Sequence, residues 1–234
     1  TSAPAAPATP AAPEAPKAEP ITDLVIGRLA TRELETFNIL YSTSYSDFEN
    51  LTNMIDSLVE VDTKGNVVPA IAESWETNDN GKTWTFHIRE GVKWVDSQGR
   101  EVAEVKADDF VAGMQHMMDA MGGLEYLIEG IIVNATEYIN DEVTDFAEVG
   151  IKALDDYTLQ YTLEAPCSYF MTMLGYGVFA PMNRAYYESQ GGKFGAEYDP
   201  AAADYQYGVT KDNIAYCGPF LVTNFTANNT IAFE

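Results

Sequence analysis

The segment GNVVPAIAESWETNDNGKTWTFHIREGVKW, residues 65–94, decides the fold of this chain. Within it Trp84, Phe86 and Ile88 alternate with polar residues, and this period of two predicts a strand with one buried face. The NDNG sequence at 78–81 is a turn signal, and the residues before it suit a preceding strand. The segment therefore predicts a β-hairpin with an aromatic inner face.

Apolar residues recur at three- and four-residue steps over residues 47–61 and 108–121, and this spacing predicts two helices. The residues predicted to share the buried faces are Phe48, Leu51, Met54, Ile55 and Leu58 in the first and Phe110, Met114, Met117 and Met121 in the second. Asp108 and Asp109 lie in the first turn of the second helix, where acidic side chains interact favourably with the helix dipole. The methionine stripe is interpreted as core rather than as a cofactor site.

Shorter strand and turn patterns, together with the two helices, predict an α/β fold. The predicted strands are 21–27, 158–163 (after a turn at Asp155–Asp156), 220–225 and 230–234, with a turn at 64–66, a helix end and buried crossing at 171–182, and an exposed loop at 191–208. The chain ends inside a β pattern, from which we expect the native protein to continue.

Composition excludes several classes of partner. Acidic residues outnumber basic ones 36 to 13, giving a net charge of -23, and such a surface repels nucleic acids and anionic lipid headgroups. We interpret the charge as a solubility feature and draw no specificity from it. No apolar run approaches the roughly 18 to 20 residues needed to span a bilayer. Residues 1–20 are rich in Ala and Pro and are predicted to be a disordered, extended linker.

The sequence contains no motif of hydrolytic, phosphate-binding or metal chemistry. GxSxG, HExxH, GxxxxGK[ST] and a strand-linked GxGxxG are all absent. His87 and His116 have no nucleophile or metal ligand at motif spacing and are interpreted as surface or structural residues. We therefore predict no enzymatic activity, no cofactor and no metal, although a hydrolase assembled from distant residues stays an alternative.

Cys167 and Cys217 are the two cysteines of the chain. They suit either one disulfide in an oxidising compartment or two buried thiols, and their spacing does not decide between these. Neither has a CxxC partner, so zinc and redox roles are disfavoured.

The hairpin segment resembles a characteristic segment of the extracellular solute-binding proteins of ABC importers, in particular the oligopeptide-binding lipoproteins. Three further stretches resemble the same family in order and approximate spacing: VKADDFVAGMQHMMDA at 105–120, VGIKALDDYTLQYTLEAPCSYF at 149–170 and YCGPFLVTNF at 216–225. The sequence VDSQGREVAEVKADDF, at 95–110, is similar to the corresponding segment of the family's Gram-positive members. Together these stretches extend over nearly all of residues 21–234.

The resemblance implies a two-lobed, periplasmic-binding-protein-like (type II) fold with mixed sheets, truncated here. Residues 21–55 and 167–234 would form part of lobe one, residues 56–166 a small inserted subdomain, and the second lobe would be absent. It also implies a protein on the extracellular face of a Gram-positive cell membrane, held only by a lipid anchor before residue 1. Its partners would be oligopeptides and ABC permease subunits.

The function implied is peptide binding without a chemical reaction. The lobes close over an extended peptide and hold its main chain as an added strand. The candidate ligand-binding residues are Tyr41, Ser42, Tyr45, Met173 and Tyr176, and for each tyrosine a packing role is at least an equal alternative. The family often places an aromatic ring from the small subdomain over the ligand. The matching stretch here reads GGLEYL, with glycines at that place and Tyr126 nearby. A peptide-sensing or adhesion lipoprotein, or a receptor for another solute, stays possible.

Overall fold

The computed structural model of this protein describes residues 24–27, 34–78 and 80–234. The predicted linker, residues 1–20, lies outside these ranges, as do residues 21–23 of the predicted first strand. The described remainder of that strand, 24–27, is exposed and is not a strand, so the prediction is wrong there. β-branched composition favours a strand only where packing supports it. Residues 24–27 and the ranges from 34 onward belong to separate compact units.

The elements of the larger unit are short. Its helices are α1 (Tyr45–Leu51), α2 (Ala107–Ala120), α3 (Ala135–Ile139), α4 (Phe170–Met173) and α5 (Arg184–Ser189), with 3-10 helices η1 (Glu125–Leu127), η2 (Phe146–Glu148), η3 (Gly177–Phe179) and η4 (Gly195–Glu197). Its strands are β1 (Val59–Val61), β2 (Val67–Pro69), β3 (Ala72–Asn78), β4 (Thr83–Ile88), β5 (Lys93–Val95), β6 (Glu101–Glu104), β7 (Ile151–Asp155), β8 (Thr158–Thr162), β9 (Val222–Thr226) and β10 (Thr230–Phe233).

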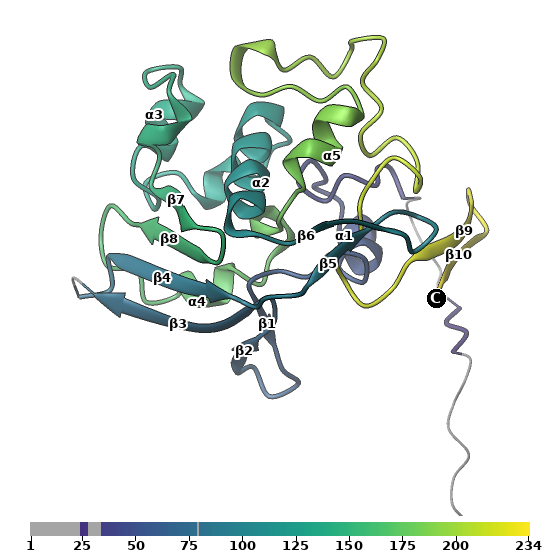
Figure 1. The fold of residues 1–234 in the computed structure, drawn as a ribbon, viewed down its shortest axis with the longest axis horizontal. Helices are drawn as coiled ribbons and strands as arrows, with labels where there is room; N and C mark the ends of the chain where they lie inside the picture. Colours follow the sequence, from purple (N-terminus) through teal and green to yellow (C-terminus); the bar gives the residue numbers. More distant parts are fainter. Residues whose placement is uncertain (1–23, 28–33, 79) are drawn as a thin grey trace, which may run out of the picture. The chain divides into compact units, whose positions relative to one another are not determined.

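The predicted hairpin is confirmed and forms half of a four-stranded sheet in the order β3-β4-β8-β7 (Figure 1). Trp75 pairs with Phe86, and Phe86 pairs with Leu159 on β8, so the buried positions of three strands align. Helix α2 packs on β7 and β8. All strand pairs within the described ranges are antiparallel. The remaining pairs, β1-β2, β5-β6 and β9-β10, are separate hairpins.

The helix predicted over residues 47–61 is wrong beyond its first part, because α1 ends at Leu51 and the chain enters β1 at Val59. The side chains of Asn50, Thr52 and Asn53 donate hydrogen bonds to helix carbonyls at 2.7 to 3.2 Å. Side chains that bond locally to the backbone in this way compete with helix propagation. The five apolar residues are nevertheless all buried, as predicted.

Helix α2 is fixed at its start by the buried carboxylate of Asp109. This carboxylate accepts hydrogen bonds from the indole of Trp94 at 2.8 Å, the backbone N–H of Lys106 at 2.9 Å and the amide of Asn183 at 3.2 Å. Burial raises the pKa of the Asp109 carboxyl to about 6, although the three hydrogen bonds act to lower it. The methionines of the helix are core, as predicted, except Met121, which is exposed in a left-handed C-cap.

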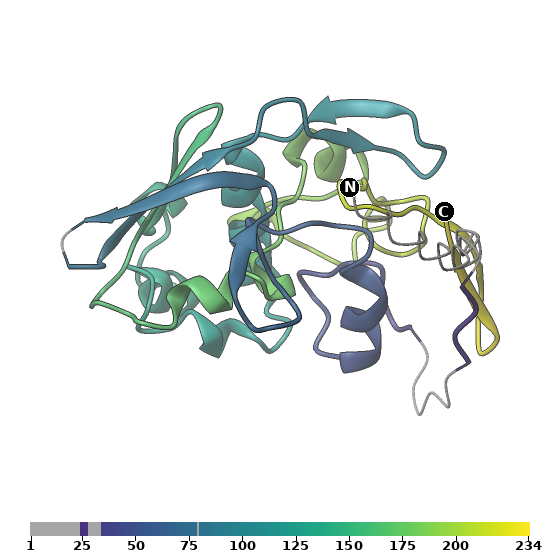
Figure 2. The same cartoon turned by 90° about the horizontal axis from the view of Figure 1, so that it is seen from below.

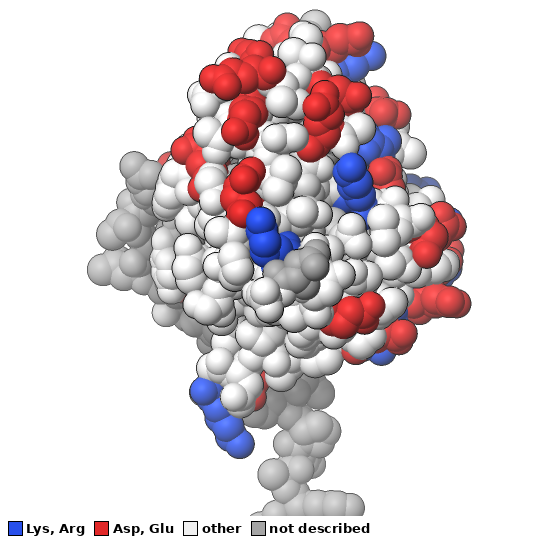
Figure 3. Space-filling view, turned by 90° about the vertical axis from the view of Figure 1, so that its left-hand side faces the viewer, with Lys and Arg blue, Asp and Glu red and all other residues white. Residues whose placement is uncertain are grey.

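The β9–β10 hairpin confirms the last two predicted strands and lies on the side of this unit opposite the tip of β3–β4 (Figures 1 and 2). The apolar core between them is continuous from Phe37 to Val222. The boundaries predicted at residues 56 and 167 therefore stay predictions. On the face shown in Figure 3, acidic side chains gather at the end that carries α3, where Asp141, Glu142 and Asp145 are exposed.

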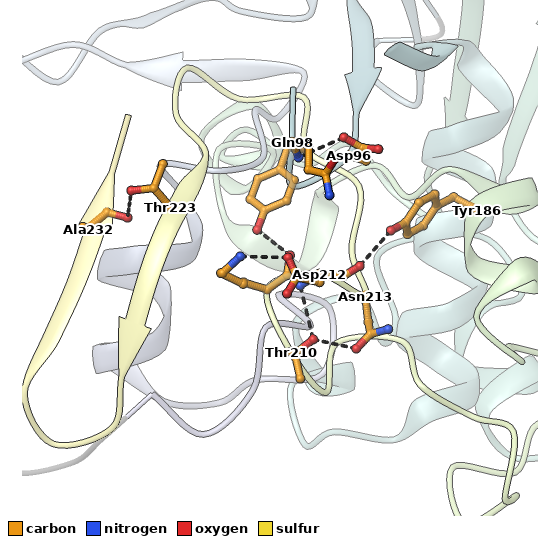
Figure 4. Close-up of polar contacts among 10 residues, drawn as sticks. Asp96, Gln98, Tyr186, Thr210, Asp212, Asn213, Thr223 and Ala232 are labelled. Atoms are coloured by element: carbon orange, nitrogen blue, oxygen red, sulfur yellow. Dashed lines mark hydrogen bonds and ion pairs between the residues drawn. The ribbon is translucent and has the colours of Figure 1, made fainter. Parts of the chain in front are cut away.

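The stretch 191–208, predicted as an exposed loop, is irregular and mostly exposed or half-buried, as predicted, but it also packs aromatic rings inward. Tyr207 is buried and lies 5.1 Å from Tyr187 of α5, measured between ring centroids, while Phe194 lies 5.0 Å from the same ring. Glycine and proline patterns indicate a loop but do not reveal what its rings contact. The following turn is closed by the Thr210 hydroxyl, which donates to the side chain of Asn213 at 2.6 Å (Figure 4). It is joined to α5 by the Tyr186 hydroxyl, which donates to the Asp212 carbonyl at 3.2 Å.

Replacement of Asp109 by Ala is expected to lower the free energy of unfolding by about 3 kcal/mol, because it leaves the buried indole N–H of Trp94 and two half-buried donors unpaired. The neighbouring Asp108→Ala is the control. Asp108 forms an exposed pair with Arg184, and its loss is expected to cost less than about 1 kcal/mol. Urea denaturation of both variants measures the difference, and equal losses would contradict the role given to Asp109.

Candidate functional site

Three segments distant in sequence meet beside α1: residues 41–45, 121–126 and 173–177. A Cβ added to Gly122 would lie 2.4 Å from the carbonyl oxygen of Tyr41, so the first two segments are in direct contact. The third joins through Tyr176, whose ring lies 5.0 Å from that of Phe48 on α1. These contacts bring four of the five predicted binding residues, Tyr41, Tyr45, Met173 and Tyr176, to the same part of the molecule.

The fifth predicted residue, Ser42, is buried and fixes the first segment from behind. Its hydroxyl donates to Asp47 at 2.6 Å and accepts from the backbone N–H of Ser44 at 3.1 Å. The carboxylate of Asp47 also accepts from the backbone of Glu35 at 3.1 Å. The Ser42 side chain therefore shapes the segment while its neighbours Tyr41 and Thr43 face outward.

The glycines of GGLEYL allow the chain to pass close to Tyr41. Gly122 has no space for a side chain, and Gly123 has a φ of +112°, a conformation that favours glycine. The N–H of Gly123 donates to both oxygens of the buried Glu125 carboxylate, at 2.9 and 3.1 Å. This turn presents Tyr126 on the surface.

Tyr126 stands close to Tyr176. Burial raises the pKa of Tyr176, and the nearby phenol of Tyr126 raises it further. Behind Tyr176, an added Cβ at Gly177 would lie 2.4 Å from the Phe48 ring, so this turn is also tightly packed. Met173, on α4, is half-buried.

The exposed large side chains of these segments form what we call the tyrosine face. Its members and their exposed fractions are Tyr41 47%, Tyr45 77%, Met121 56%, Tyr126 65% and Tyr176 42%. Tyrosine offers both a large apolar ring and a hydroxyl, and such side chains are common where proteins bind other molecules. The sequence placed Met121 on the buried face of its helix and so missed it as a member of this face, although the glycine pair at 122–123 was a local signal that the helix ends there.

Two hollows of about 560 and 380 Å³ lie elsewhere. The first lies between α2, η2 and η4, and the second lies beside the start of α2 and α5. Neither is lined by a residue of the tyrosine face. They are not continuous with the candidate site.

The described ranges contain no candidate metal site and no disulfide. No group of three or more His, Cys, Asp or Glu side chains there could hold a metal ion. Cys167 and Cys217 are both free, so the possible disulfide is not formed; Cys217 is buried and Cys167 half-buried. His87 is bound to Glu76 at 3.0 Å, and His116 is buried in α2.

The helices within the described ranges are short, the longest being α2. None of them is long and apolar enough to span a bilayer.

Comparison with known proteins identifies related sequences. The family described as "Bacterial extracellular solute-binding proteins, family 5 Middle" matches residues 66–234. The oligopeptide-binding protein AmiA of Streptococcus pneumoniae is 39% identical over 88% of this chain, and SarA of Streptococcus gordonii is 36% identical over 90%. The chain spans only 30% of the length of each of these curated relatives.

Solved structures share the fold. The substrate-binding domain of an oligopeptide ABC transporter from Bacillus anthracis matches with a TM-score of 0.73 at 28% identity, covering 88% of this chain and 36% of that one. Haemophilus influenzae OppA in complex with the peptide RPPGFSPFR matches with a TM-score of 0.71 at 28% identity, covering 86% and 36%. The α/β, type II binding-protein fold predicted from the sequence is therefore confirmed for the part of it that this chain spans.

Replacement of Gly122 by Ala is expected to destabilise the chain by about 1–3 kcal/mol, because the new methyl group must displace the backbone of Tyr41. Gly175→Ala, on the same side of the molecule, is the control, since its Cβ would meet no atom closer than 3.6 Å. Chemical denaturation measures stability, and the amide signals of residues 40–44 in a ¹H–¹⁵N spectrum report the displacement. Two variants of equal stability would refute the contact.

Proposed function

Because this chain belongs to family 5 of the bacterial extracellular solute-binding proteins, we propose that the protein containing it captures oligopeptides outside the cell and delivers them to the permease of an ABC importer. We further propose that it is a lipoprotein of a Gram-positive bacterium, anchored at the extracellular face of the cell membrane by a lipid before residue 1. The Ala- and Pro-rich composition of residues 1–20 suits a spacer between such an anchor and the folded part.

The observation that carries the proposal is the 39% identity with a streptococcal oligopeptide-binding protein. Peptide is also the ligand in the Haemophilus structure and in a Listeria monocytogenes OppA structure of the same fold. The chain spans about a third of these structures, 36% and 34%. We propose that residues 21–55 and 167–234 belong to one lobe, that 56–166 form its inserted subdomain, and that a second lobe supplies the opposite wall.

The tyrosine face supports the capture of an extended peptide. Thr43 is exposed, and neither its N–H nor its C=O has a hydrogen-bond partner among the described residues. A peptide main chain can pair with such free backbone groups, which makes binding tolerant of peptide sequence. Tyr41 and Tyr126 would then contact side chains of the ligand. No reaction follows, and binding energy is used only to favour the closed arrangement of the lobes.

Native mass spectrometry of the protein at its native length tests the ligand class. We expect co-purified peptides that are released on denaturation and exchange with added peptide. A bound sugar or steroid would contradict the proposal. The steroid outcome is specific, because a relative that is 32% identical is named as a probable deoxycholate-binding protein.

Uptake assays separate an importer from the alternative, a peptide-sensing or adhesion lipoprotein. Deletion of the gene should abolish growth on peptides as the sole source of a required amino acid, and deletion of the adjacent permease should have the same effect. Normal growth of both strains, with loss of a peptide response or of attachment, would favour the alternative. Release of free amino acids by the purified protein would indicate a hydrolase.

Replacement of Tyr41 or Tyr126 by Ala is expected to weaken peptide affinity of the native-length protein about tenfold each, through lost contact of roughly 1.4 kcal/mol. Tyr157→Ala is the control. Tyr157 precedes β8 beside the first turn of α2, whereas the tyrosine face lies at the other end of this helix, about 20 Å away. Calorimetry measures affinity, and equal effects at all three positions would oppose the assignment.

The 234-residue chain alone is expected to bind peptide at least about a hundredfold more weakly than the native-length protein, because a single wall buries less of the ligand. Calorimetry on both forms with one peptide measures the ratio. Equal affinities would show that no second lobe is required.

A further inference from the structure

A buried polar contact links α2 to the segment that leads into the tyrosine face. Nε2 of His116 lies 2.8 Å from Nδ2 of Asn38. The exposed fractions of these side chains are 0% and 4%. A hydrogen bond enclosed this completely costs more to break than one at the surface, because neither partner can turn to water.

Asn38 organises the turn that follows it. Its side-chain Oδ1 accepts from the N–H of Leu40 at 3.1 Å, and its backbone carbonyl accepts from the N–H groups of Tyr41 and Ser42, both at 3.2 Å. The bond to Leu40 fixes the orientation of the amide, because a flipped amide would place two donors face to face. Nδ2 must therefore be the atom that faces His116, and it donates.

The role of Asn38 as donor determines the state of the imidazole. Nε2 of His116 has to accept, which places the ring proton on Nδ1. Nδ1 has no hydrogen-bond partner among the described residues. Aromatic rings surround the imidazole instead, and the distances between ring centroids are 4.7 Å for Tyr187, 5.7 Å for Tyr198 and 5.9 Å for Tyr207. Burial lowers the pKa of His116 to about 3, so the ring is neutral near pH 7.

Asn38 is tightly enclosed, and the hydroxyl of Tyr205 is a second polar neighbour of its side chain. An added Cβ at Gly208 would lie 2.6 Å from the Cβ of Asn38, and the Gly208 carbonyl accepts from the N–H of Phe37 at 2.9 Å. The aromatic stretch 191–208 thus packs against Asn38 as well as against His116. Without an acceptor at position 116, the Asn38 amide would keep only Tyr205 as a polar neighbour, and it would turn towards that hydroxyl and shift the following turn.

We propose that His116 is a positioning residue for ligand binding: its Nδ1–H tautomer accepts the Asn38 amide, and Asn38 sets the turn that presents Tyr41 and Thr43. That Tyr41 and Thr43 bind a ligand rests on the proposed function. The contact between His116 and Asn38 does not depend on it. His116 touches no ligand and acts only through Asn38.

Long-range ¹H–¹⁵N spectra of the imidazoles test the tautomer directly in the 234-residue chain. The chain has only 2 histidines, and the exposed His87 provides the reference signal. We expect His116 to give the Nδ1–H pattern unchanged between pH 5 and pH 8. An Nε2–H pattern, or a ring that becomes protonated in this range, would overturn the proposal.

Variants test the positioning role. His116→Gln retains an acceptor and is expected to keep peptide affinity of the native-length protein within about threefold, whereas His116→Leu should lose about tenfold. Asn38→Ala should lose as much, and the double variant no more than either single one, since both remove the same interaction. Met117→Leu, also buried in α2, is the control and should bind normally. Unchanged affinity in His116→Leu would refute the proposal.

A further variant keeps the test independent of folding and of ligand identity. Asn38→Asp still accepts from Leu40 and, as the ionised carboxylate, cannot donate, so at a pH where it is ionised the ring of His116 should carry its proton on Nε2. A ring that does not switch would show that Asn38 does not set it. If no variant binds any peptide but the tautomer switches, the proposed function fails while the contact stands.

Discussion

The buried carboxylate of Asp109 is the interaction on which the arrangement of this chain depends. It joins the indole of β5, the first turn of α2 and the residue before α5 through three hydrogen bonds. Desolvation of a carboxylate is costly, and only several charge-assisted bonds offset it. The start of α2 is therefore held by hydrogen bonds to β5 and to the residue before α5. The far end of α2 then determines where the glycine turn at 122–123, and with it the tyrosine face, can lie.

Much of the fold could be predicted from local patterns. The aromatic β3–β4 hairpin, β8, β9, β10 and most of α2 follow from periodicity and turn signals, which act within a few residues. The helix over 47–61 failed because apolar spacing indicates burial, not backbone conformation, and the side chains of Asn50, Thr52 and Asn53 end the helix. The prediction for the loop 191–208 was correct for its backbone and incomplete for its side chains. Its composition indicates irregular backbone correctly but says nothing of the tyrosines that pack beneath it.

The candidate site was less predictable, because its contacts join segments tens of residues apart. Tyr41, Tyr45 and Tyr176 were named from the sequence, and the structure brings them together, yet their assignment as ligand contacts stays a prediction. Ser42 illustrates the difficulty. A serine next to an exposed tyrosine looks like a ligand group, but here its hydroxyl is committed to Asp47. No local pattern reveals that commitment, nor the bond between Asn38 and His116.

The division between buried supports and exposed rings has an evolutionary consequence. Ser42, Asp47, Gly122 and Glu125 hold the backbone, whereas the side chains of Tyr45 and Tyr126 project from it. Surface substitutions away from structural supports usually change stability by less than about 0.5 kcal/mol. The outward positions can therefore accept many residue types without loss of the fold. Gene duplication followed by exchange of these few side chains would yield receptors with new ligand preferences on an unchanged scaffold.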